Sequence, residues 1–228
     1  MPHRRREVSR VEGFSDAVFA FAITLLVVSL EVPRTFDELM HVMRAFPAFA
    51  VSFAMLFQVW WRQYRFFRAY DVEDSFVIVI TGILLFVVLF YVYPLKFVWS
   101  LSFHGIEGRR LTDDVIADRQ APLLFVIYGV GVIAVFSLLA LLYRHAYRLR
   151  SELELTAAEI LDARVEMFRN LSIAAWGALS VALALILPTA QAPKAGYVYF
   201  GIGITETILG TYRGKKHREL EVAKRAEV

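Results

Sequence analysis

The chain has 228 residues, of which 58% are hydrophobic and 14% aromatic, whereas soluble globular domains are about 45–50% apolar. It contains no cysteine, which excludes disulfide bonds and thiolate metal ligands. The net charge of +3 is not arranged as a basic motif interleaved with aromatic residues, so we expect no nucleic-acid partner.

The first apolar run, RVEGFSDAVFAFAITLLVVSLEVP, predicts a helix over residues 10–31. Ser9 and Glu12 fit a capping box at its start, and Pro33 marks its end. The run is about 20 residues long, which is enough to cross a bilayer core of about 30 Å. It carries Asp16 and lacks a small-residue cleavage site, so we interpret it as a retained membrane helix rather than a signal peptide.

Five further helices follow in the apolar pattern. Pro94 is expected to kink or end the third helix, and Thr156 and Glu159 form a second capping box at the start of the fifth. We therefore predict an all-α integral membrane protein with six transmembrane helices in a single domain, residues 1–228. The five further helices are expected to cover roughly residues 36–67, 74–101, 122–148, 157–188 and 195–212.

The basic residues predict the orientation of these helices by the positive-inside rule. They are far more numerous on one side and fall on alternate loops, as six spans require, so we expect both termini in the cytoplasm. Taken alone, each cluster of basic residues is also typical of helix ends that are exposed to water. The larger group is Arg4, Arg5, Arg6, Arg10, Arg62, Arg65, Arg68, Arg144, Arg148, Arg150, Arg164, Arg169, Arg213, Lys215, Lys216, Arg218, Lys224 and Arg225, and the smaller is Arg34, Arg44, Lys96, Arg109, Arg110, Arg119 and Lys194.

A polar constellation opens the first helix in the pattern R-x-x-x-F-S-D. A carboxylate at this depth is costly unless it is paired or hydrated. Two interpretations stay open for Asp16: an acid in the headgroup zone, or the partner of a neighbouring group. The motif residues are Arg10, Phe14, Ser15 and Asp16, and the candidate partners are Arg10, Arg62, Arg65 and the indole N–H groups of Trp60 and Trp61.

This motif, at the opening of the first of six hydrophobic helices, resembles the signature of the transmembrane protein 175 family, potassium-permeable channels of bacterial membranes and of animal endosomes and lysosomes. The stretches DAVFAFAITLLVV and FQVWWRQYRFFR are also similar to the family. The resemblance covers the six-helix layout of nearly the whole chain. One departure stands in the second stretch, because relatives often carry histidine after the tryptophan, where this chain has Arg62 and Gln63.

The resemblance implies a homotetramer in which the first helix of each subunit lines the pore, without a re-entrant filter loop. The chain contains no T-V-G-Y-G filter sequence. Counted from the motif aspartate, the narrow hydrophobic layer falls at Phe21, where relatives usually place a branched aliphatic residue. The hydroxyl layer implicated in potassium preference falls at Thr24, and further apolar layers fall at Leu25 and Val28.

Helical spacing gives the same face without reference to the family, because Ala17, Phe21, Thr24 and Val28 repeat at intervals of four, three and four residues. For the Thr24 hydroxyl, an alternative to a pore role is a bond back to the carbonyl of Ala20, which is common in helices.

We therefore expect a potassium-permeable cation channel of the cell membrane, with monovalent cations, mainly potassium, and membrane lipid as partners. No cofactor or metal is expected, and no enzyme motif is present, so we expect no enzyme. Glu206 in the sixth helix either pairs with Arg213 or an adjacent helix, or carries protons. The alternatives to a channel are a proton-coupled secondary transporter, which would favour inverted repeats and several midplane charges, and a non-conducting membrane scaffold.

Overall fold

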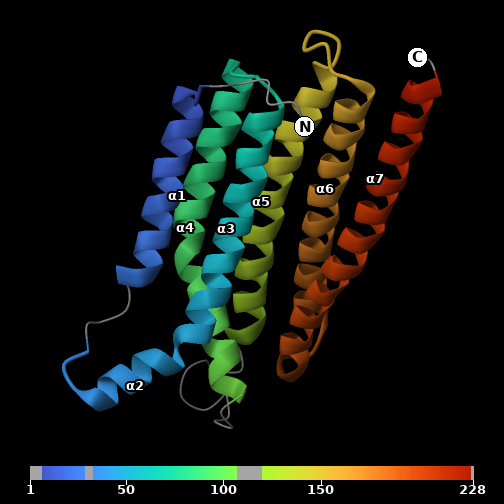
Figure 1. The fold of residues 1–228 in the computed structure, drawn as a ribbon. Coiled ribbons are helices and arrows are strands. Elements are labelled where there is room, and N and C mark those ends of the chain that lie inside the picture. Colours follow the sequence, from blue (N-terminus) through green and yellow to red (C-terminus); the bar gives the residue numbers. More distant parts are fainter. Residues whose placement is uncertain (1–6, 29–32, 107–119, 227–228) are drawn as a thin grey trace.

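A computed structural model gives the structure of residues 7–28, 33–106 and 120–226, and these residues form helices without any strand (Figure 1). The all-α prediction is confirmed for this part of the chain. The elements in chain order are α1 (Arg10–Val28), α2 (Phe36–Arg44), α3 (Phe46–Ala69), α4 (Ser75–Ile106), α5 (Ala121–Arg148), α6 (Ala157–Ile186), the 3₁₀ helix η2 (Thr189–Phe200) and α7 (Gly201–Ala226).

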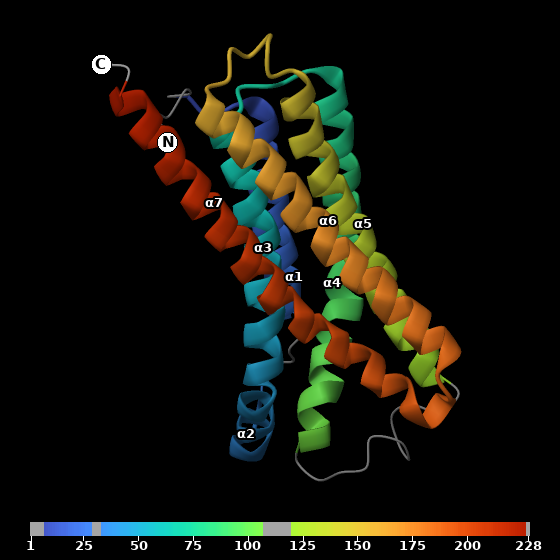
Figure 2. The same ribbon diagram turned by 90° about the vertical axis from the view of Figure 1, so that its right-hand side faces the viewer.

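The long helices run up and down through one bundle, and α7 lies beside α6 and is tilted relative to it (Figures 1 and 2). The start of α1, the α3–α4 turn, the α5–α6 turn and the end of α7 lie at the same end of the bundle (Figure 1). We call it the basic end, because Arg10, Arg68, Arg148 and Lys215 all lie on these segments. The helix directions therefore bring together the segments that the charge pattern assigned to one side.

Three helical segments of the described chain are each long and apolar enough to cross a membrane. The bent pair of α2 and α3 would make a fourth such segment. Neither α1 nor α7 adds to this number within the described residues. The three segments are Ser75–Ser100, Pro122–Arg148 and Ala157–Ile186.

The second predicted helix, residues 36–67, is broken at Ala45 into α2 and α3, whose axes differ by 44°. Pro47 lies in the first turn of α3, where its missing N–H costs nothing, but its ring opposes a continuous helix through the preceding residues. Thr35 and Glu38 exchange side chain to backbone hydrogen bonds of 3.2 and 3.3 Å at the start of α2. As a result, α2 projects sideways from the bundle (Figure 1).

The middle helices agree more closely with the sequence prediction. α4 runs through Pro94 and ends at Ile106, past the expected end at residue 101. Neighbouring helices packed in apolar surroundings tolerate a proline in this way. α5 matches the predicted range within one residue, and α6 ends two residues early because Leu187 is extended before Pro188. The capping box of Thr156 and Glu159 is confirmed.

The two outermost helices differ from their predicted ranges. Instead of one helix over residues 195–212, η2 continues to Phe200 and α7 then extends to Ala226. The polar end of α7 is supported by an ion pair of 2.7 Å between Lys216 and Glu219 at helical spacing. α1 ends at Val28, and residues 29–31 of the predicted range lie outside the described residues.

The helices α5 and α6 pack closely through two glycines. A Cβ atom on Gly129 would lie 3.2 Å from the carbonyl oxygen of Gly177, and one on Gly177 would lie 3.3 Å from the carbonyl oxygen of Gly129. The missing side chains therefore let the two backbones touch. Gly131 has the same function for α4, since the ring of Tyr91 occupies the place of a Cβ atom. This packing gives a tightly joined half of the bundle beside α1 and α3.

Candidate functional site: the first helix and its polar anchors

α1 has one buried and one exposed face. Phe19, Ala22 and Leu26 are at most 1% exposed and lie on the side that contacts α3 and α4. The side chains on the opposite side are exposed in the part of the chain that the structure describes. We call this side the free face of α1, which consists of Arg10, Phe14, Ala17, Phe21 and Thr24.

Of the predicted pore positions whose side chains are described, Ala17, Phe21 and Thr24 lie on the free face and Leu25 lies on its flank. Phe21 is 57% exposed. The hydroxyl of Thr24 donates to the carbonyl of Ala20 at 2.9 Å, which is the alternative considered from the sequence, and this bond leaves the oxygen lone pairs free to accept. Leu25 lies on the flank and packs partly against the core. The side chain of Val28 lies outside the described residues.

Asp16 is bound by an indole, one of the partners considered from the sequence. Trp60 Nε1 donates to Asp16 Oδ1 at 2.7 Å. A hydrogen bond to a charged group stabilises a fold by about 1.5–3 kcal/mol. Trp61, in contrast, is 45% exposed and stacks on Tyr64 with ring centroids 5.6 Å apart. Of the two tryptophans, Trp60 is therefore the one that bonds to Asp16 and joins α1 to α3.

Two more contacts join α1 to the end of α3. The Ser15 hydroxyl donates to the carbonyl of Val11 at 2.8 Å and accepts from Gln63 Nε2 at 3.4 Å. The Glu12 side chain, 2% exposed, forms an ion pair of 3.2 Å with Arg68 Nε. Ser9 still accepts from the Glu12 backbone N–H at 3.1 Å, so half of the expected capping box is present while the carboxylate pairs with α3.

A buried cluster of charges joins α3, α6 and α7, and its centre is Glu166 of α6. The Glu166 side chain is 2% exposed. Its carboxylate lies 2.8 Å from Arg65 and 3.1 Å from Arg169. Arg62 and Arg213 follow at 3.7 Å each. Four guanidinium groups thus surround one buried carboxylate.

Glu206 of α7 is the second acid of this cluster. Arg62 Nη2 donates to it at 2.9 Å and Arg169 Nε at 2.6 Å. Arg213 bonds instead to Asp162 at 2.6 Å. Of the pairings considered from the sequence for Glu206, the structure therefore shows the one with adjacent helices.

The contacts of Glu166 and Arg68 were not predicted from the sequence. The available signal was the presence of charged residues in apolar helices, because charges buried in a membrane segment need partners. Which acid meets which base depends on helix packing between residues as far apart as Arg65 and Glu166, 101 positions along the chain.

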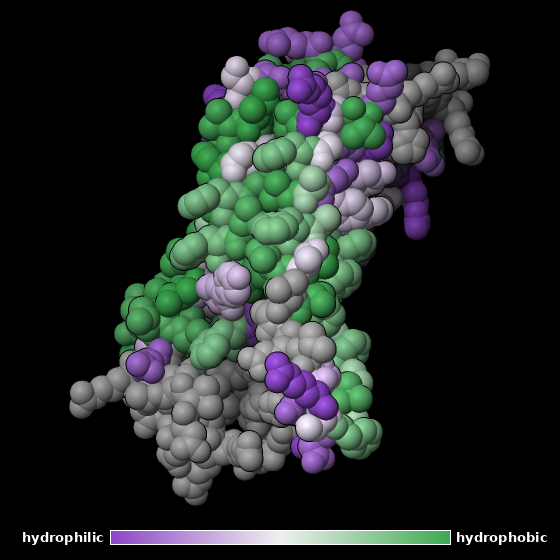
Figure 3. Space-filling view, turned by 90° about the vertical axis from the view of Figure 1, so that its left-hand side faces the viewer, coloured by the Kyte–Doolittle hydropathy of each residue, from purple (hydrophilic) through white to green (hydrophobic). Residues whose placement is uncertain are grey.

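The side of the bundle that carries α1 shows a broad hydrophobic band between hydrophilic residues near its two ends (Figure 3). A membrane-embedded surface has this distribution. It also means that the free face of α1 lies on an apolar side of the protomer.

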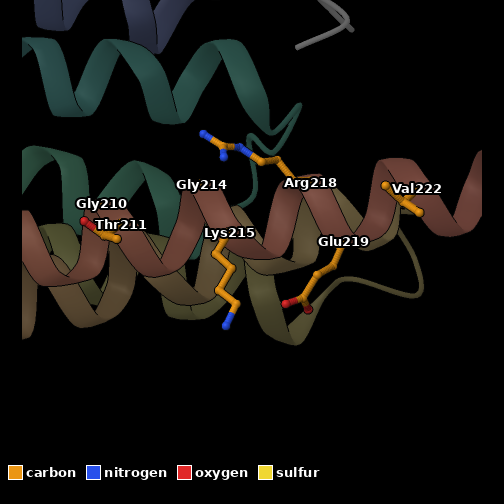
Figure 4. Close-up of a pocket in the computed structure, with 7 residues that line it drawn as sticks. All are labelled: Gly210, Thr211, Gly214, Lys215, Arg218, Glu219 and Val222. Atoms are coloured by element: carbon orange, nitrogen blue, oxygen red, sulfur yellow. The ribbon is translucent and has the colours of Figure 1, made fainter.

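The exposed side of α7 carries a separate notch of about 850 Å³. Lys215 and Arg218 point away from each other there, so their charges do not converge on one ligand (Figure 4). Its described lining comes from α7 alone: Gly210, Thr211, Gly214, Lys215, Arg218, Glu219 and Val222.

Comparisons with known proteins find similarity to potassium channels. The family model described as "Endosomal/lysosomal potassium channel TMEM175" matches residues 10–91. A protein of Marivirga tractuosa named "Potassium channel" is 37% identical over 227 residues, which cover 95% of this chain and 92% of that protein. "Potassium channel Cha6605_3372" of Chamaesiphon minutus is 34% identical over 96 residues, which cover 39% of this chain and 47% of that protein.

Solved structures show the same similarity. A crystal structure of a variant of the potassium channel MtTMEM175, in complex with a nanobody fusion protein, has a TM-score of 0.80 at 36% identity. The match covers 93% of this chain and 96% of that chain. A lysosomal potassium-selective TMEM175 homologue from Chamaesiphon minutus has a TM-score of 0.55 at 23% identity over 90% of this chain and 99% of that chain, a likeness of fold alone.

Proposed function

The chain belongs to the TMEM175 family of potassium channels, and from that premise we propose that it forms a potassium-permeable cation channel. Four copies assemble around a central pore, and ions pass through it down their electrochemical gradient. The family is one of ion channels, and we propose no enzymatic activity. The family membership supports this proposal, together with the geometry of α1.

The observation that carries the proposal is the free face of α1. A helix packed on one side and exposed on the other has a surface left for water, lipid or further copies. On this helix the exposed side carries Thr24 and small Ala17 beside Phe21. Four such faces around an axis stack Phe21 into an apolar ring, which offers a hydrated cation no oxygen ligand and acts as a constriction.

A ring of Thr24 beside that constriction offers oxygen atoms to a partly dehydrated ion. The hydroxyl proton is used by the carbonyl of Ala20, so the outward side of the oxygen is an acceptor, as a cation requires. Leu25 and Val28 complete the apolar layers. Asp16 is an anchor between α1 and α3 in this proposal, outside the ion path.

The proposed topology has six spans, both termini in the cytoplasm and the basic end on the cytoplasmic side of the cell membrane. Because the chain has no cysteine, introduced thiols report topology without background. Cysteine at Lys215 should react with an impermeant maleimide only from the cytoplasmic side, and cysteine at Lys194 only from outside. Reaction of both positions from one side contradicts the six-span arrangement.

The decisive experiment replaces Thr24 by valine, which keeps the side-chain shape and removes the hydroxyl. We expect the preference for potassium over sodium to fall, measured as reversal potential in planar bilayers. Thr207→Val is the matched control, because Thr207 is exposed on α7 and makes the same bond to the residue four positions earlier at 2.8 Å. The control should leave the reversal potential unchanged.

Phe21→Ala should raise the conductance, because the apolar ring widens. Phe168→Ala, an exposed phenylalanine of α6, is its control and should have no effect. If assembled Phe21→Ala and Thr24→Val channels keep the wild-type conductance and reversal potential, the free face of α1 does not line the pore. Ion flux that saturates and needs a coupling ion would indicate the transporter alternative, and absence of flux the scaffold.

A further inference from the structure

An aromatic ladder runs along the outer side of α3. Consecutive rings lie 5.2–6.3 Å apart from Phe46 to Trp60. Phe53 and Phe57 stack nearly parallel, with an interplanar angle of 12°. Phe57 is 45% exposed within the protomer. The rings are ordered against one another: Phe49 and Trp60 pack partly against the core, and Phe46, Phe53 and Phe57 are exposed.

A second aromatic stripe follows α4. Phe86 and Phe90 are each 71% exposed, and Tyr93 is 58% exposed. The spacing of four and three residues places the three rings on one face of the helix. α4 thus carries an uncovered row of large rings, as α3 does.

The exposed positions of α5 and α6 have a different composition. On α5 the most exposed apolar side chains are Leu123 and Val130, and on α6 they are Leu185 and Ile186. Aliphatic side chains are well solvated by lipid tails. Aromatic side chains, in contrast, are enriched at the core of protein interfaces, where they bury a large area and lose little side-chain freedom. α3 and α4 therefore expose rows of large rings, whereas the exposed apolar side chains of α5 and α6 are mainly aliphatic.

The two aromatic rows flank the free face of α1. α1 packs against both α3 and α4, and Trp60 at the end of the ladder binds Asp16 of α1. If α1 faces a central axis, its two flanking helices face the adjacent copies, because a closed ring repeats one head-to-tail contact.

We propose that the aromatic ladder of α3 docks against the aromatic stripe of α4 on a second copy of this chain. The inference rests on the proposed function, since it needs α1 at the axis. It adds the surface that closes the ring, and the pore is incomplete without that contact.

The levels of the two rows agree. Measured from the end of α3 at Ala69 and the start of α4 at Ser75, Phe57 and Phe86 lie about 18 Å and about 17 Å along their helices. Both distances start from the basic end. Two subunits standing side by side in one membrane therefore present Phe57 and Phe86 at the same depth.

The experiment uses full-length Phe57→Cys and Phe86→Cys chains carrying different tags, expressed together in one membrane and oxidised with copper phenanthroline. We expect a disulfide-linked product that carries both tags. Either variant expressed alone should give no linked product, because a head-to-tail contact does not place a residue opposite itself. A mixture of Leu123→Cys and Leu185→Cys chains is the lipid-facing control and should stay unlinked.

An Ala17→Cys chain separates this inference from the proposed function. Linked Ala17→Cys dimers without a product from the Phe57→Cys and Phe86→Cys mixture overturn the docking surface and leave α1 at the axis. If neither links, the proposed arrangement of α1 fails as well. Linkage in the lipid-facing control, or of Phe57→Cys with itself, also overturns the inference.

The same surface is tested without cross-linking. Phe57→Ala removes a ring from the ladder and should reduce the tetramer fraction in detergent, measured by size-exclusion chromatography with light scattering. Leu123→Ala should leave that fraction unchanged. Equal tetramer fractions for both variants and the wild type would assign the ladder to lipid.

Discussion

Replacement of Glu166 by glutamine should destabilise the protein strongly, because the change preserves shape and removes one charge from the centre of a buried cluster. Glutamine leaves Arg62, Arg65, Arg169 and Arg213 facing only the acids at the edges of the cluster. Removing one partner from a buried ion pair costs about 3–5 kcal/mol. For a chain of this size, 1 kcal/mol shifts the melting temperature by about 2–4 °C.

The expected loss is therefore roughly 6–20 °C in the melting temperature, followed by tryptophan fluorescence in detergent. Glu219→Gln is the control, since Glu219 forms an exposed ion pair near the end of α7 and should melt like the wild type. The double variant Glu166→Gln/Arg65→Gln should recover part of the loss, because it restores the charge balance. A Glu166→Gln protein that melts within 2 °C (roughly the 0.5–1 kcal/mol scale) of the wild type would refute the view that charge balance holds α3, α6 and α7 together.

Two further changes test individual contacts. Trp60→Phe and Asp16→Asn should each lower the melting temperature and the tetramer yield while leaving the reversal potential unchanged, since the bond between Trp60 and Asp16 anchors α1. A well-assembled variant with altered ion preference would place Asp16 in the ion path. At the start of α4, partial burial raises the pKa of Asp74, but a hydrogen bond of 2.9 Å from the backbone N–H of Val77 and one of 2.5 Å with His145 outweigh it and hold the pKa below its usual value. A carboxyl group whose pKa is lowered by folding stabilises the protein above its unfolded pKa of about 3.9, and this stability is lost as the pH falls through the folded pKa. Asp74→Asn should therefore flatten the fall of the melting temperature with pH below about pH 4. An unchanged dependence of the melting temperature on pH would contradict this role of Asp74.

The helices that the sequence predicted well are those with long apolar runs. α5 is the clearest case, because its residues from Leu123 to Tyr143 are apolar except for Ser137, and its ends are marked by Pro122 and Arg148. The break at Ala45 was missed, since apolar residues continue across it and Pro47 is compatible with either a helix start or a kink. The extension of α7 to Ala226 was missed for the opposite reason, because its polar end has no apolar periodicity to detect.

The candidate site likewise has a part that could be predicted from the sequence and a part that could not. The face of α1 that contains Phe21 and Thr24 follows from spacing within one helix, and the burial of its opposite side agrees with that spacing. The contacts of Glu12 with Arg68 and of Glu166 with Arg65 join helices distant in the chain. They depend on the depth and rotation at which helices pack, which hydrophobic periodicity does not specify.

The charge cluster has a consequence for the order in which the chain is built into a membrane. α7 is too polar to count among the apolar spans, and it carries Glu206, whose counter-charges stand on α3 and α6. Insertion of that carboxylate into lipid is costly while it is alone and much less so once both arginines are already in place. Synthesis delivers the arginines first, because α3 and α6 precede α7 in the chain. We expect biogenesis to stall at the last helix whenever an earlier one is displaced, which makes the C-terminal segment a built-in check that the rest of the subunit has assembled.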